Sequence, residues 1–223
     1  NGADAIGRVW LEGEDDLEGV EVRLGSGKTK TNKKGQFHLK GLAAGETGLM
    51  GNKRGYFFPM VRIDLQRGSR KVAVLKGYLE RKARVRWAFQ SDGSRNLADD
   101  LQEGETILGN ERYTRISFAD GFVESRGNCD FQMMQVKDEL ILEQYGGSRD
   151  TGFIRLADIT FDEVLQAPSV KYDHKRASMR EGDIFIFKTH GGEHYGKLEV
   201  LEIMAGSKAQ ERALSDLARE PLE

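Results

Sequence analysis

Residues 182 to 203 read GDIFIFKTHGGEHYGKLEVLEI and hold the clearest structural signal of the chain. Ile184 and Ile186 alternate with Phe185 and Phe187 ahead of Gly191-Gly192, and apolar and charged residues alternate again behind it. A period of two is typical of β-strands, and a glycine pair suits a two-residue turn between antiparallel strands. The stretch therefore predicts a β-hairpin that closes an antiparallel sheet or a barrel in the C-terminal half.

The same stretch spells a metal motif, since His190, Glu193 and His194 match the H-x-x-E-H string of inverted zinc peptidases. That chemistry needs both imidazoles on one face of a helix, with the glutamate as general base. In a hairpin, His190 faces Glu193 across the ladder and His194 points to the other side, so the two histidines do not share one metal. We therefore predict no metal site and keep His190, His194 and His174 as the only candidate ligands.

Bulk composition excludes several classes of protein. The 223 residues carry 34 Lys and Arg against 36 Asp and Glu, a net charge of −2 that gives no general attraction to nucleic acid. The single cysteine, Cys129, excludes an intramolecular disulfide, and no apolar run is long enough to span a bilayer. The chain begins with Asn1 rather than Met, which fits removal of a signal peptide, and a lipid anchor would then precede it.

The N-terminal part repeats short alternating strands between glycine turns. Its elements are Gly7-Arg8-Val9, then GVEVRL at residues 19 to 24, then TNKKGQFHLKGLAAG at residues 31 to 45. This order resembles the carboxypeptidase regulatory-like family over residues 3 to 88. The resemblance implies a transthyretin-like β-sandwich that serves as an accessory, non-catalytic and commonly extracellular module. Trp10 and Trp87 are predicted at inward or near-inward positions, so neither is assigned to sugar stacking.

The C-terminal part resembles a second family less closely. Asp130-Phe131 on a strand, ITFDEV at residues 159 to 164, Ala167-Pro168, and Tyr195-Gly196-Lys197-Leu198 after a glycine turn follow the order of the HmuY-like haem carriers. The resemblance implies an all-β fold outside the cytoplasm. The tryptophan that the family places before the Asp-bearing strand is replaced by Cys129, and no histidine here aligns with the haem ligands. No cofactor is therefore predicted, and haem binding stays an alternative.

One basic segment is a candidate binding surface. Residues 52 to 86 hold eleven Lys and Arg against two acids. Such a surplus suits an acidic protein or a polyanionic glycan, although basic residues on outward strand positions also prevent edge pairing. The outward candidates for partner contact are Arg62, Lys82, Arg84 and Arg86.

Together these patterns predict an all-β protein with a transthyretin-like sandwich at residues 1 to 90 and a linker at 91 to 96. An antiparallel β domain at 97 to 205 and a short C-terminal helix in 206 to 223 follow. There is no G-x-S-x-G nucleophile elbow, and Cys129 has no basic neighbour in sequence, so we predict no enzyme. The leading hypothesis is an extracytoplasmic binding or adhesion-type protein with a protein or glycan partner. A haem or small-ligand carrier is the alternative, and a zinc hydrolase is the third.

Overall fold

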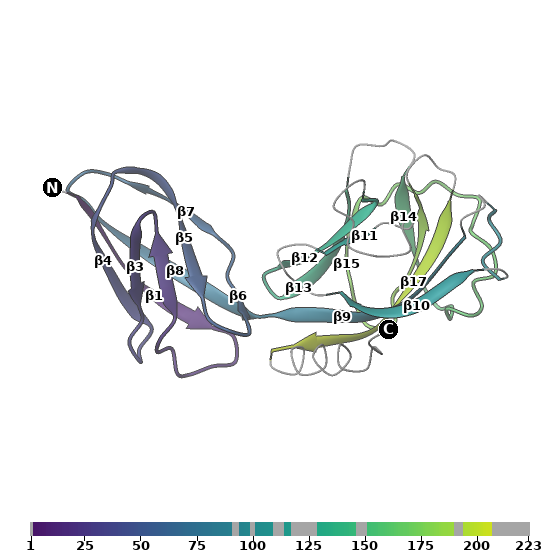
Figure 1. Cartoon of the computed structure of the whole chain (residues 1–223), viewed down its shortest axis with the longest axis horizontal. Helices are drawn as coiled ribbons and strands as arrows, with labels where there is room; N and C mark the ends of the chain where they lie inside the picture. The colour runs from purple at the N-terminus through teal and green to yellow at the C-terminus, as the bar shows by residue number, and fades with distance from the viewer. Residues whose placement is uncertain are drawn as a thin grey trace, which may run out of the picture. The chain divides into compact units, whose positions relative to one another are not determined.

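The computed structural model describes residues 2–90, 94–98, 101–108, 114–116, 129–145, 151–189 and 194–206 (Figure 1). All regular secondary structure in these residues is β-strand, which confirms the predicted all-β fold. Residues 161–163 form a turn. The predicted C-terminal helix and the Gly191-Gly192 turn lie outside the described residues. The chain divides into two compact units, Asn1–Glu80 and Arg81–Glu223.

The boundary between the two compact units falls after Glu80, whereas the sequence predicts it after Gln90. Strand β9 (Arg81–Gln90) pairs with β10 (Gln102–Leu108) and β17 (Tyr195–Ala205), both in the second unit. Residues 94–96 of the predicted linker also belong there, because Asn96 bridges Gln166. The alternation of the sequence runs on through residues 61 to 89, and it does not tell which partner each strand takes.

The first unit is a β-sandwich of two four-stranded sheets. The order of the first sheet is β4-β1-β8-β6. It consists of β1 (Ala3–Leu11), β4 (Gln36–Leu42), β6 (Tyr56–Phe57) and β8 (Arg70–Leu79). The order of the second sheet is β3-β2-β5-β7, with β2 (Glu21–Leu24), β3 (Gly27–Lys30), β5 (Gly45–Asn52) and β7 (Val61–Leu65). Both sheets supply the core, as Leu75 of β8 and Leu49 of β5 illustrate.

Phe58 fits between two glycines of the first unit. A Cβ atom built on Gly51 of β5 would lie 2.5 Å from the Phe58 ring, and one built on Gly77 of β8 would lie 2.6 Å from it. Real Cβ atoms do not approach so closely, so side chains at these two positions would displace the ring. The two glycines therefore create the space that lets Phe58 pack against the core.

Within the described residues, the second unit contains two open antiparallel sheets. Of the two predicted alternatives, an antiparallel sheet or a barrel, these residues therefore show the sheet. The larger sheet has the order β10-β9-β17-β16-β14, with β14 (Gly152–Leu156) and β16 (Ile184–Lys188). The smaller has the order β11-β12-β13-β15. Its strands are β11 (Thr114–Ile116), β12 (Phe131–Val136), β13 (Glu139–Gln144) and β15 (Arg176–Ser178). Phe131, Phe153 and Phe187 pack between the two sheets.

The hairpin strands predicted from the opening stretch are present. Strands β16 and β17 pair antiparallel, with Ile184 opposite Glu199 and Lys188 opposite Tyr195. All four residues from Ile184 to Phe187 are buried. Phe185 and Phe187 face the core between the sheets, whereas Ile184 and Ile186 face a second core on the other side. Residues 157–172 supply much of that second core, so β16 is covered on both faces.

Candidate functional site

Two of the three histidine candidates, His174 and His194, lie in the described part of the chain. His190 and Glu193 lie outside the described residues. His194 precedes β17, and its carbonyl accepts a hydrogen bond from the Thr189 N–H at 3.0 Å. His174 is exposed and stacks on the buried Phe153 at 6.1 Å between ring centroids. Within the described ranges, no three His, Cys, Asp or Glu side chains form a group that could hold a metal ion.

The four basic candidates are divided between the two units. Arg62 lies on β7 of the first unit, where its Nη1 is 3.4 Å from Glu46. Lys82, Arg84 and Arg86 lie on β9 of the second unit. Arg84 contacts Glu105 at 3.2 Å, so its charge is partly neutralised within its own sheet. The surplus seen along the sequence is thus divided between units.

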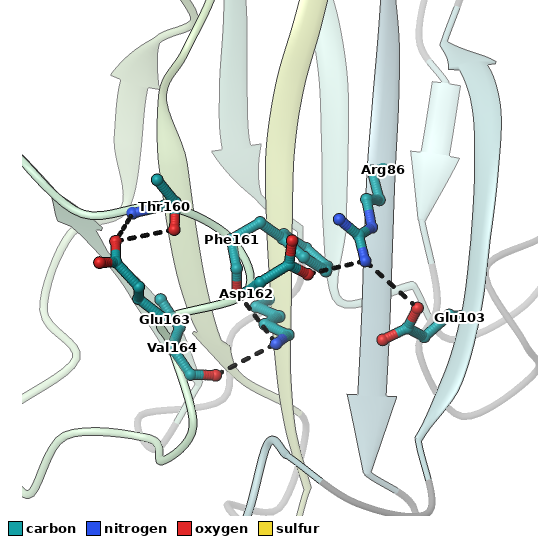
Figure 2. Close-up of polar contacts among 8 residues, drawn as sticks. Arg86, Glu103, Thr160, Phe161, Asp162, Glu163 and Val164 are labelled. Atoms are coloured by element: carbon teal, nitrogen blue, oxygen red, sulfur yellow. Dashed lines mark hydrogen bonds and ion pairs between the residues drawn. The ribbon is translucent and has the colours of Figure 1, made fainter.

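Arg86 takes part in a polar cluster built on the second core (Figure 2). Its guanidinium lies 2.9 Å from Asp162 and 3.5 Å from Glu103 of β10. It also lies over the buried Phe161 ring, 4.2 Å from the ring centroid. Figure 2 shows Arg86 between the 160–164 turn and β10.

Lys197 completes this cluster from β17. Its side chain is buried between strands that place Ala88 and Ile186 opposite it. Its Nζ donates hydrogen bonds to the Phe161 carbonyl at 3.0 Å and the Val164 carbonyl at 3.1 Å. The same Nζ lies 4.4 Å from the Phe161 ring centroid. The ammonium therefore joins the 160–164 turn to the sheet.

Three charged side chains of this region, Lys197, Arg86 and Glu163, have shifted pKa values. Burial lowers the pKa of Lys197, because an ammonium is less stable away from water. The hydrogen bond to Asp162 raises the pKa of Arg86. Hydrogen bonds from the Thr160 hydroxyl and N–H lower the pKa of Glu163. These contacts fasten the turn over the sheet and leave the Lys197 ammonium enclosed by protein atoms, so we assign the cluster a structural role.

A different surface emerges on the first unit. We call the side of sheet β4-β1-β8-β6 that points away from the core the outer face. Trp10 is 45% exposed there, and Val72 and Val74 are 70% and 58% exposed. Tyr78 meets Trp10 edge to face, with ring centroids 6.2 Å apart. The expectation that Trp10 lies inward is wrong, because Val9 and Leu11 occupy the inward positions of β1.

The parallel pairing of β1 and β8 places apolar residues of both strands on the outer face. Ile6 lies opposite Val72, and Trp10 lies opposite Lys76. Val72 and Val74 are successive outward residues of β8, since Ala73 between them is buried.

Comparison of β8 with β16 isolates what is unusual about the outer face. Both strands contain four successive apolar residues, at 72–75 in β8 and at 184–187 in β16. In β16 all four are buried, whereas in β8 only Ala73 and Leu75 are buried. The sequence signal for this surface was therefore the unbroken apolar run in β8.

Comparisons with solved structures give weak likenesses. No family model matches the chain, and no curated protein matches it. A mutant type II cohesin–X-dockerin complex from Acetivibrio cellulolyticus is 18% identical over 33% of this chain and 52% of that one, with a TM-score of 0.26. A DUF3823 family protein from Parabacteroides merdae is 12% identical over 64% and 89%, with a TM-score of 0.26. The Bacillus anthracis TIE protein is 12% identical over 89% and 48%, with a TM-score of 0.28.

The chain spans about half the length of the cohesin–dockerin and TIE chains that it matches. Among the residues that the structure describes, none form a helix of the length and apolarity that a membrane span requires. The functional case therefore rests on the surfaces of the chain itself.

Proposed function

We propose that the chain is a non-catalytic binding protein that acts outside the cytoplasm and docks a partner on the outer face of its first unit. The observation that carries this proposal is the exposure of Trp10, Val72 and Val74 on two adjacent parallel strands. Isolated exposed apolar residues are ordinary in proteins, but contiguous ones mark interaction surfaces. Tryptophan is also among the residues that contribute most to binding energy at interfaces.

The absence of catalysis is part of the proposal. The buried charged side chains that have been described are engaged in contacts that hold the fold together. Asp183 pairs with Arg155 and accepts a hydrogen bond from the Arg180 N–H, while Lys197 donates to two carbonyls. Contacts of this kind support a structural role for these two groups. The extracytoplasmic setting follows from the resemblance of the N-terminal unit to carboxypeptidase regulatory-like modules.

A differential binding experiment tests the role of the outer face. The chain and its Trp10→Ser/Val74→Ser variant are immobilised, exposed to the extracytoplasmic fraction of the cells that make the protein, and compared by quantitative mass spectrometry. We expect at least one protein to be retained by the native chain and lost from the variant. A matched control is Leu165→Ser/Val170→Ser, because these side chains of the second unit are 58% and 56% exposed. Equal retention by all three chains would contradict the proposal.

A further inference from the structure

The outer face carries a distinct distribution of charge around its apolar centre. Its exposed cations are Arg8 on β1, Lys40 on β4, and Arg70 and Lys76 on β8. Its carboxylate is Asp4, which accepts a hydrogen bond from the Gly41 N–H and lies 3.4 Å from His38. That hydrogen bond lowers the pKa of Asp4, so the carboxylate stays ionised and remains bonded to a group of its own sheet. A partner therefore meets cations around an apolar centre.

The strand register places these cations beside apolar residues. Arg8 lies opposite Val74, and Lys76 lies opposite Trp10 with its Nζ 6.0 Å from the Trp10 ring centroid. Arg8 is held in place, because its Nε donates to the Lys34 carbonyl at 3.0 Å. A partner that covers the apolar residues must therefore also approach these cations, and carboxylates at those positions would complement them.

We infer that the outer face binds a protein partner whose contact segment combines apolar side chains with Asp and Glu. This inference rests on the proposed function and adds the chemistry of the partner. A second copy of the chain fits less well, because a symmetric contact would bring cations against cations. A glycan fits less well because valines offer no ring for stacking, and Trp10 and Tyr78 lie at 70° to each other rather than as one flat platform.

The probe for this inference is a displayed library of random peptides selected on the whole purified chain. Selected peptides are synthesised, and their dissociation constants are measured against three double variants. Trp10→Ser/Val74→Ser removes apolar contact, Arg70→Glu/Lys76→Glu reverses charge, and Leu165→Ser/Val170→Ser is the control. Circular dichroism verifies that each variant keeps its β-structure.

We expect the enriched peptides to combine apolar residues with Asp or Glu. Both outer-face variants should weaken their binding at least about tenfold, whereas the control should stay within about twofold. Raising the salt concentration to about 0.5 M should also weaken binding, because salt screens the attraction between these cations and the carboxylates of the peptide.

The possible failures separate the two levels of the proposal. The peptides could bind Trp10→Ser/Val74→Ser weakly but bind Arg70→Glu/Lys76→Glu as tightly as the native chain. That result would overturn the acidic partner and leave the outer face as a docking site. Peptides that bind all variants equally, or a library that yields no binder dependent on the outer face, would overturn both. Two other results would overturn the acidic protein partner. A dimer in sedimentation equilibrium that dissociates in the Trp10→Ser/Val74→Ser variant would favour a second copy of the chain. Selective binding to a glycan array would favour a glycan.

Discussion

Lys197 shows what sequence periodicity misses at the scale of one residue. Its position between Tyr195 and Glu199 predicts a solvated polar side of β17, yet its side chain is buried and bonded to the 160–164 turn. Periodicity gives the side of a strand on which a residue lies, but not whether another segment covers that side. Trp10 is the opposite case, because its alternation with Val9 and Leu11 indicates an outward position and the side chain is 45% exposed there.

Replacing the Lys197 ammonium should destabilise the second unit. Lys197→Met leaves the Val164 carbonyl without the ammonium donor and leaves the Phe161 carbonyl with only the Val164 N–H at 3.3 Å, at an expected cost of about 1–3 kcal/mol in unfolding free energy. Urea unfolding followed by Trp87 fluorescence in a Trp10→Phe background reports on this unit, since the chain has only two tryptophans. Lys171→Met is the control, with a side chain 85% exposed. Equal midpoints for both variants would contradict the anchoring role.

Tyr172 should make the second unit sensitive to alkaline pH. Burial, with a smaller effect of Tyr195, raises the pKa of its phenol from 10.0 to about 12. Between pH 10 and about 12 the unfolded chain loses this proton while the folded chain keeps it, so the contribution of Tyr172 to stability falls as pH rises. The predicted loss is on the order of 2 kcal/mol across that interval.

The matched variant for this effect is Tyr172→Phe. It loses the hydrogen bond from the hydroxyl to the Pro168 carbonyl, about 1 kcal/mol at neutral pH. Its deficit relative to the native chain should shrink above pH 10, as measured by urea unfolding at successive pH values. Parallel curves for the two chains across this range would show that Tyr172 titrates normally.

At the scale of elements, the strands were largely predictable and their partners were not. Val61, Ile63 and Leu65 alternate with Arg62 and Asp64, and the structure contains β7 at those residues. Pairing of β9 with β17 joins residues more than a hundred positions apart, and nothing local in the sequence encodes that contact. Because the two strands of this pair lie so far apart in the sequence, the sequence predicts the boundary between the units after Gln90, whereas the first unit ends at Glu80.

The slot around Phe58 gives a prediction about strands β5 and β8. Gly51→Ala places a Cβ atom 2.5 Å from the Phe58 ring and should lower the stability of the first unit by about 1–3 kcal/mol. Adding Phe58→Ala should make the Gly51→Ala change nearly neutral, because the ring is then absent. Trp10 fluorescence during urea unfolding, in a Trp87→Phe background, measures both effects.

The control for the slot lies on the same strand. A Cβ atom at Gly48 would meet the Sδ atom of Met60 at 2.6 Å, and Met60 is 57% exposed and flexible enough to move. Gly48→Ala should therefore be close to neutral. A cost for Gly48→Ala as large as that for Gly51→Ala would show that glycine is needed on β5 for some reason other than Phe58.

At the scale of the whole chain, each unit has a core of its own, which predicts where the chain can be divided. A fragment of residues 1 to 80 contains every strand of the sandwich and should fold as a monomer. A fragment of residues 1 to 90 also carries β9 without its partners β10 and β17, which exposes Ala83, Val85 and Phe89. That fragment should self-associate.

Circular dichroism and sedimentation velocity compare the two fragments. A cooperative thermal transition and a monomeric mass for the shorter fragment are the expected results. A folded, monomeric longer fragment beside an unfolded shorter one would restore the boundary at Gln90 and contradict the pairing of β9 described above.

The central claim is that the outer face of the first unit binds a partner, and Trp10 is the natural reporter of that event. In a Trp87→Phe background it is the only tryptophan, and it lies among the residues that binding would cover. Titration with a selected acidic peptide should shift its fluorescence emission to shorter wavelength, and Val74→Ser should weaken that titration. Binding of the peptide with unchanged Trp10 emission would place the contact elsewhere and contradict the claim.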